Sequence, residues 1–115
     1  MWIFTRDGFL SAVAHRDQPD HLMVRARERS HLQSMIDFAK SYEPIVVSNT
    51  PSADYHWRCV VSKRTFAAFM AEQIQGIDYD NFKGSLADAD YHDACLGVWQ
   101  TMHDFQTPTI IIEGN

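Results

Sequence analysis

Histidine and cysteine are the side chains of this chain with the widest chemistry, because they ligate metals, move protons and act as nucleophiles. His92 and Cys95 lie three residues apart in a segment with helical periodicity, so both side chains could reach one ion. A zinc site needs further ligands, and the sequence has neither a C-x-x-C nor an H-x-x-x-H pair. We therefore predict no metal and no cofactor, with His92 solvated and Cys95 in the core. The six histidines are His15, His21, His31, His56, His92 and His103.

Cys59 and Cys95 both lie in segments with an apolar pattern, which is typical of buried thiols. A catalytic cysteine needs a base beside it, and His56 is near Cys59 in sequence. A strand would point these two side chains to opposite faces, so a base for Cys59 would have to come from His92 or His103. We expect free thiols in a reducing, cytoplasmic setting, although spacing does not decide whether the two cysteines pair.

Two pairs of carboxylates are close enough in sequence for acid and base catalysis, Asp78 with Asp80 and Asp88 with Asp90. No neighbouring residue is visible that would separate the two pKa values within a pair. Asp90 fits the N-cap of a helix over residues 91–105, with Asp93 at the favourable end of its dipole. We therefore predict no catalytic residue and favour a non-enzymatic protein.

The charge of the chain is divided unevenly along its length. Residues 1–71 carry nine Lys and Arg against seven Asp and Glu, whereas residues 72–115 carry one base, Lys83, against eight acids. A field of one sign selects partners of the opposite sign, so a partner protein with a basic surface is expected. The formal net charge of −5 argues against direct binding to nucleic acid, which requires a basic surface.

Aromatic residues lie among these acids, an arrangement that many protein interfaces use for anchoring. We assign Phe82 and Trp99 to the core, and Tyr79 and Tyr91 to an interface. The predicted partner-binding residues are Asp78, Tyr79, Asp80, Asp88, Asp90, Tyr91 and Asp93.

A basic row lies earlier in the chain, at Arg25, Arg27 and Arg29, and the first two share one face of a predicted strand. Such a row could hold a phosphate or a carboxylate ligand. The interpretation we favour is that these arginines pair with acids such as Glu28 or Asp37, or with the acidic end of the same or a second molecule.

These residues must be positioned by a small set of elements, which hydrophobic periodicity and turn signals delimit. Three strands are expected first, with a tight turn at Asp7-Gly8, and a helix whose capping box is Ser30 and Gln33 follows them. The predicted strands cover residues 2–5, 9–15, 22–27, 45–47 and 55–61. The strand at 55–61 is expected to put Tyr55 on the same face as Trp57, Cys59 and Val61.

The predicted helices cover residues 30–42, a segment from Ser62 to Gly76, a short piece near 79–83, and residues 91–105. In the last helix the inward side chains are expected to be Cys95, Val98, Trp99 and Met102. Residues Thr109–Ile112 form either a last strand or a packed tail.

The element order β-β-β-α-β-β-α-α, with that optional last strand, predicts an α+β fold in one domain over residues 1–115. We expect a mostly antiparallel sheet with helices on one face, and from the third strand onward the order matches a ferredoxin-like unit. No run of apolar residues is long enough for a membrane span, and the N-terminus lacks the pattern of a signal peptide.

Several segments resemble a group of short bacterial and phage proteins without an assigned activity. The similarity lies in the opening residues 2–16, in Met23–Arg27, and in pieces around Ala53–Tyr55, Asp78–Lys83 and Tyr91–Ala94. The resemblance implies an evolved domain and transfers no site, since none of these segments carries a catalytic signature.

Three functional hypotheses follow. The first is a small non-enzymatic protein-binding domain, such as a phage-derived inhibitor or regulator, that docks its acidic face on a basic, nucleic-acid-binding partner. The second is a small-molecule-binding or enzymatic domain with a pocket between sheet and helices, lined by His56, Arg58 and His92. The third is a structural homodimer in which the Arg25 and Arg27 face meets the acidic half of a neighbour.

Overall fold

The computed structural model describes residues 1–106 and 108, and the chain forms two compact units, Met1–Asp78 and Tyr79–Asn115. Each unit is described here by itself. The predicted last strand at Thr109–Ile112 lies outside the described residues. One folding domain over residues 1–115 stays a prediction.

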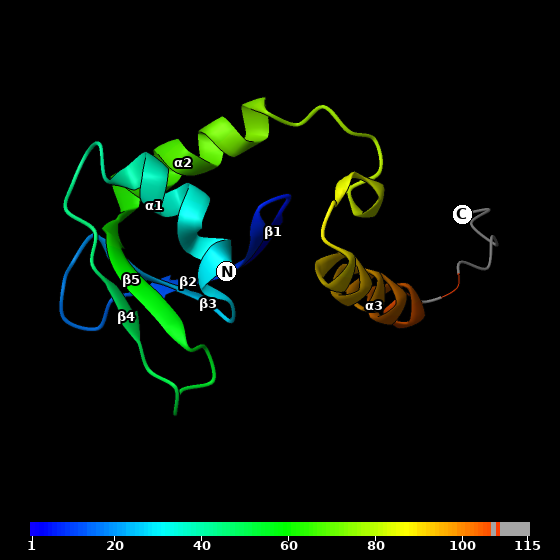
Figure 1. Ribbon diagram of the computed structural model, residues 1–115, viewed down its shortest axis with the longest axis horizontal. Helices are drawn as coiled ribbons and strands as arrows, with labels where there is room; N and C mark the ends of the chain where they lie inside the picture. Colours follow the sequence, from blue (N-terminus) through cyan, green and yellow to red (C-terminus); the bar gives the residue numbers. More distant parts are fainter. Residues whose placement is uncertain (107, 109–115) are drawn as a thin grey trace, which may run out of the picture. The chain divides into compact units, whose positions relative to one another are not determined.

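The first unit contains a five-stranded antiparallel sheet with the spatial order β1-β2-β3-β5-β4 (Figure 1). The predicted α+β class and the predicted order of elements are confirmed. The strands are β1 (Trp2–Thr5), β2 (Gly8–Ala14), β3 (His21–Ala26), β4 (Val47–Asn49) and β5 (Trp57–Ser62).

The loop between β1 and β2 is one residue shorter than the predicted strands 2–5 and 9–15 imply, because β2 already begins at Gly8. Thr5 pairs with Gly8, which leaves Arg6 and Asp7 in the turn. Gly8 has a φ of 147°, which side chains rarely adopt, and a Cβ at this position would collide with the His31 ring. The backbone N–H of Phe9 donates to Nδ1 of His31 at 3.1 Å, so the glycine allows a contact that ties the hairpin to the helical segment beyond β3.

The helices of the first unit are η1 (Arg29–Leu32), α1 (Gln33–Ala39) and α2 (Lys63–Gln75), and Figure 1 shows α1 and α2 on the same side of the sheet. The run β3-α1-β4-β5-α2 follows the first five elements of a ferredoxin-like unit. The place beside β3 that the last strand of such a unit takes is filled by β2, which precedes β3 in the chain.

One continuous core fills the space between the sheet and these two helices. Leu10, Val24 and Val61 point from the sheet toward Met35 on α1 and Phe66 on α2, and all five side chains are buried. Burial of this apolar surface holds α1 and α2 on the sheet. The opposite face of the sheet carries the alternate residues of the same strands, among them Arg25 and Arg58.

Two of the predicted caps differ from those observed. Ser62 caps α2 as predicted, since its side chain accepts from Thr65 N–H, and Gly76 follows the last turn. The Ser30 capping box is wrong, because Ser30 lies inside η1 and α1 begins without a side-chain cap. The cap of the last helix is Asp88 rather than Asp90.

The second unit contains η2 (Lys83–Ser85) and the helix α3 (Ala89–Phe105). Asp88 accepts a hydrogen bond from the backbone N–H of Tyr91 at 2.8 Å, which fixes where α3 begins. Among residues 1–106, none of the helices combines the length and apolar content that crossing a membrane requires.

Candidate functional site

The predicted partner-binding acids are divided between the two units. Asp78 closes the first unit, where its carboxylate binds the Arg6 guanidinium at 2.7 Å, and Arg6 also donates to the Gly76 carbonyl. The charge of Asp78 is thus partly compensated within its own unit. Asp80, Asp88, Asp90 and Asp93 belong to the second unit, and all four are exposed.

Three of these acids gather at the N-terminal end of α3. Asp88 is its cap, Asp90 lies in its first turn, and Asp93 follows less than one turn later with its carboxylate 3.3 Å from Nδ1 of His92. Asp104 adds a fifth exposed acid near the other end of the helix. Against these five, Lys83 is the base among the described residues of this unit, so its surface is strongly negative.

The two tyrosines predicted to anchor a partner are not equally available. Tyr91 is 9% exposed, so its ring offers little surface to a partner. Tyr79 is half-buried and packs on Phe82, with 5.7 Å between ring centroids.

The C-terminal half of α3 exposes a row of large apolar side chains, and here the prediction that Val98, Trp99 and Met102 point into a core is wrong. Val98 is 40%, Trp99 47%, Met102 57% and Phe105 78% exposed, whereas Cys95 is buried. Val98, Met102 and Phe105 follow the i, i+4, i+7 spacing of one helix face, with Trp99 at its edge. We call these four residues the α3 stripe.

Trp99 is held within the second unit by two neighbours. The Lys83 ammonium lies 5.1 Å from the centre of its ring, and the His103 ring stacks on it at 5.2 Å. A hollow of about 440 Å³ lies beside the stripe, lined by Trp99, Met102, His103, Phe105 and Gln106. The stripe is therefore an ordered surface with a concave end.

A second concentration of chemistry lies on the sheet face turned away from α1 and α2. The Tyr55 ring is buried there between Arg25, 4.6 Å from its centre, and Arg27, at 4.3 Å. Phe9 packs near the same ring at 6.4 Å. Tyr55 thus lies with the arginines and not on the core face with Cys59 and Val61, which corrects the prediction for this residue.

The arginines on this face outnumber the acids that bind them. Arg27 binds the Asp54 carboxylate at 2.9 Å, and this contact lowers the pKa of Asp54. Arg25 donates to the Ser11 hydroxyl at 2.8 Å, and Arg58 donates to the Tyr55 carbonyl at 3.2 Å. Arg25 and Arg58 are directly opposite each other on β3 and β5.

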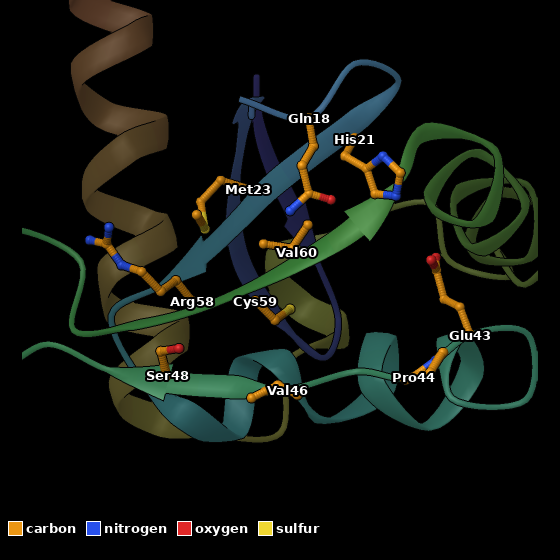
Figure 2. Close-up of a pocket in the computed structure, with 10 residues that line it drawn as sticks. All are labelled: Gln18, His21, Met23, Glu43, Pro44, Val46, Ser48, Arg58, Cys59 and Val60. Atoms are coloured by element: carbon orange, nitrogen blue, oxygen red, sulfur yellow. The ribbon is translucent and has the colours of Figure 1, made fainter. Parts of the chain in front are cut away.

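A cavity of about 330 Å³ opens beside these strands (Figure 2). Of the three residues that the pocket hypothesis named, Arg58 lines this cavity. The exposed His56 and the second-unit residue His92 do not. Its lining residues are Gln18, His21, Met23, Glu43, Pro44, Val46, Ser48, Arg58, Cys59 and Val60.

Glu43 closes one end of this cavity. Partial burial by itself raises the pKa of Glu43, but hydrogen bonds from the Ser62 backbone N–H, the Ser62 hydroxyl and Thr65 outweigh it, so the pKa lies below its ordinary value of 4.5. The carboxylate is thus committed to holding the start of α2.

The thiols show no sign of activation. Cys59 and Cys95 are both free and buried, as predicted, and burial raises the pKa of Cys59 to about 11. A thiol with so high a pKa is a poor nucleophile at neutral pH. Within residues 1–106 and 108, no three His, Cys, Asp or Glu side chains gather as metal ligands do.

The acids singled out from the sequence are exposed, and their role in binding stays a prediction. The exposure of the α3 stripe was not predicted. Comparison with protein-family models, with curated proteins and with solved structures gave no match.

Proposed function

We propose that this protein is a small non-enzymatic binding domain that inserts α3 into an apolar groove with a basic rim on a partner protein. The observation that carries the proposal is the exposure of all four α3 stripe residues, Val98, Trp99, Met102 and Phe105. Contiguous apolar patches of this kind are uncommon on proteins that act alone.

The spacing of the stripe supports a helix-in-groove mode. Val98, Met102 and Phe105 occupy i, i+4 and i+7, which is the anchor pattern of amphipathic helices that dock in grooves. Trp99 and Phe105 supply large rings of the type that dominate interface energetics. Burial of this row against a partner would be the main source of affinity.

The acids of the second unit have a different part in the proposal. Asp104 follows Met102 by two positions, and such neighbours point to nearly opposite sides of a helix. We infer that Asp93 and Asp104 attract the partner over several ångströms, while Asp88 and Asp90 lie nearer the groove rim. Charges of this kind raise the association rate and set its salt dependence more than they set the final affinity.

A partner with a nucleic-acid-binding surface fits this chemistry, because such surfaces combine positive charge with apolar contacts. Inhibition or regulation of such a protein is the role we propose, and an origin among short bacterial or phage proteins is part of the proposal. A cytoplasmic location is part of the proposal, and the two free thiols support it.

The test is affinity capture from the native cell with quantitative mass spectrometry, followed by binding kinetics with each captured candidate. The variant Met102→Glu/Phe105→Glu puts charge in the stripe at two exposed positions, so the fold should persist. We expect it to lose the partner, with an affinity at least roughly tenfold lower. Replacing Asp88, Asp90 and Asp93 by Asn should mainly slow association and flatten its salt dependence, and Asn can still cap α3 at position 88.

The matched control is Gly97→Glu, which adds an acid to the same helix at an exposed position with open space for a Cβ, and whose neighbours three and four residues away are not stripe residues. It should bind like the unmodified protein. A partner held equally by Met102→Glu/Phe105→Glu and by the unmodified protein would overturn the proposal.

A further inference from the structure

We propose that the sheet face turned away from α1 and α2 binds a small organic anion, with its carboxylate or phosphate group held by Arg25 and Arg58 and its body in the adjoining cavity. All residues of this site belong to the first unit, and the proposal uses none of the α3 residues on which the binding role proposed above depends.

The first observation is the register of the two arginines. Arg25 on β3 and Arg58 on β5 are directly opposite partners in an antiparallel pair. Like charges in this position repel each other and destabilise the sheet unless something neutralises them. An oxyanion between the two guanidinium groups would turn this repulsion into attraction for the ligand.

The second observation is how little the described protein offers these two groups. Arg25 donates to the Ser11 hydroxyl and lies over the Tyr55 ring, and Arg58 donates to the Tyr55 carbonyl. The carboxylate bonded on this face, that of Asp54, is held by Arg27 and acts on Arg25 only from a greater distance. Neither Arg25 nor Arg58 has an acid within salt-bridge distance among the described residues.

The Nε atoms of Arg25 and Arg58 also indicate that this face binds a ligand. They are buried, and neither has a hydrogen-bond acceptor within the described residues. A buried donor without an acceptor is costly and uncommon in native proteins. The Nε–H edge of arginine is also one side of the fork that grips a carboxylate or phosphate through two hydrogen bonds.

The third observation is the cavity of about 330 Å³ that Arg58 lines. Its size suits a small metabolite. Figure 2 shows Arg58 and Met23 toward one end of the lining and His21 and Glu43 toward the other, with Val60 between them. The His21 Nδ1 atom is engaged with the Pro19 carbonyl at 2.9 Å, and the Glu43 carboxylate accepts from Ser62, so Arg58 is the cationic lining residue that has no acid within salt-bridge distance among the described residues.

The charge of the whole first unit favours a small anion over a nucleic acid. Residues Met1–Asp78 carry nine Lys and Arg against nine Asp and Glu. A polyanion would meet this neutral surface without the extended positive track that phosphate backbones require. A small ligand with one anionic group requires only the positive charges of Arg25 and Arg58.

The test is a titration of the full-length ¹⁵N-labelled protein, read at the Nε–H signals of Arg25 and Arg58 by NMR. The probes are phenyl phosphate, benzoate and, as the same ring without the anion, benzamide. We expect the two Nε–H signals to move and saturate with one or both anions and to stay in place with benzamide. The more effective anion identifies the ligand class, and equal effects identify a general oxyanion site.

Arg58→Lys and Arg25→Lys keep the positive charge but lose the guanidinium fork, and each should weaken binding roughly tenfold or more. Arg64→Lys, at an exposed position on α2, is the matched control and should leave binding unchanged. The amide spectrum shows whether each variant is folded. If a variant is unfolded, the titration of the unmodified protein decides the outcome. The proposal would be overturned if the Nε–H signals moved with neither anion at about 10 mM. It would also be overturned if Arg64→Lys weakened anion binding as much as Arg58→Lys or Arg25→Lys.

Discussion

At the scale of single residues, Glu43 shows how one carboxylate can serve two elements. Its Oε1 atom accepts from the backbone N–H and from the hydroxyl of Ser62, both at 3.0 Å. Ser62 is at once the last residue of β5 and the cap of α2. The strand end and the helix start are therefore held by the same acid, contributed by the segment that follows α1.

The pH dependence of this contact can be predicted in sign. Because the pKa of Glu43 is lowered on folding, its contribution to stability is complete above the ordinary value of 4.5 and is lost as pH falls through the lower, folded value. Glu43→Gln should cost about 1 kcal/mol at pH 7. The difference between the two proteins should shrink between about pH 5 and about pH 3, measured by urea unfolding at each pH. A difference that grows as pH falls would contradict this assignment.

Tyr55 shows where the alternation of a strand no longer predicts the direction of a side chain. Strand alternation puts Tyr55 with Cys59 and Val61, and it does describe those two residues, which are buried in the core. Tyr55 lies two residues before β5 begins, where the alternation no longer applies, and its ring packs with Arg25 and Arg27 instead. The cross-strand pair of Arg25 and Arg58 was equally invisible, because register depends on pairing between distant segments.

At the scale of elements, α3 is the helix whose limits matter most for function. Its N-terminal half carries Asp90, Asp93 and the buried Tyr91 and Cys95, and its C-terminal half carries the exposed stripe. Periodicity predicts which side of a helix is apolar, and it did so here. Periodicity cannot say whether another part of the protein covers that side, which is why the stripe was assigned to the core.

The cap of α3 gives a prediction that separates the expected start from the observed one. Asp88→Ala removes the bond to Tyr91 N–H and should destabilise α3 by about 1 kcal/mol. Asp90→Ala removes a charge from the first turn without removing a cap, and should cost only about 0.3 kcal/mol. Amide hydrogen exchange along residues 91–100 measures both effects. A larger loss of exchange protection in Asp90→Ala than in Asp88→Ala would instead support Asp90 as the cap of α3.

At the scale of the whole molecule, the division at Asp78 separates two kinds of chemistry. The first unit holds a core of thirteen buried residues, all between Ile3 and Phe69, and the Arg25–Arg58 face. The second holds the negative surface and the stripe. The difference in charge between the two parts of the chain could be read from the sequence, because counting charged residues requires no knowledge of contacts. The boundary between the units could not, because it depends on which residues contact each other in the fold.

Because that core is complete without the second unit, residues 1–78 should fold alone. We expect a cooperative unfolding transition with a free energy of about 3–5 kcal/mol, which is usual for a core of this size. Urea unfolding and the dispersion of the amide spectrum measure this. An unfolded or aggregated fragment would instead support a single domain over residues 1–115.

The outer strands of the sheet bear on how molecules of this protein can meet. β1 spans four residues and β4 three, so each offers a very short backbone template to another chain. β5 continues past the first residue of β4, and there the N–H of Ser62, the last residue of β5, is already occupied by the Glu43 carboxylate. Growth of this sheet from one molecule into the next is thereby discouraged, so contacts that the described sheet makes with a second molecule should rely mainly on side chains.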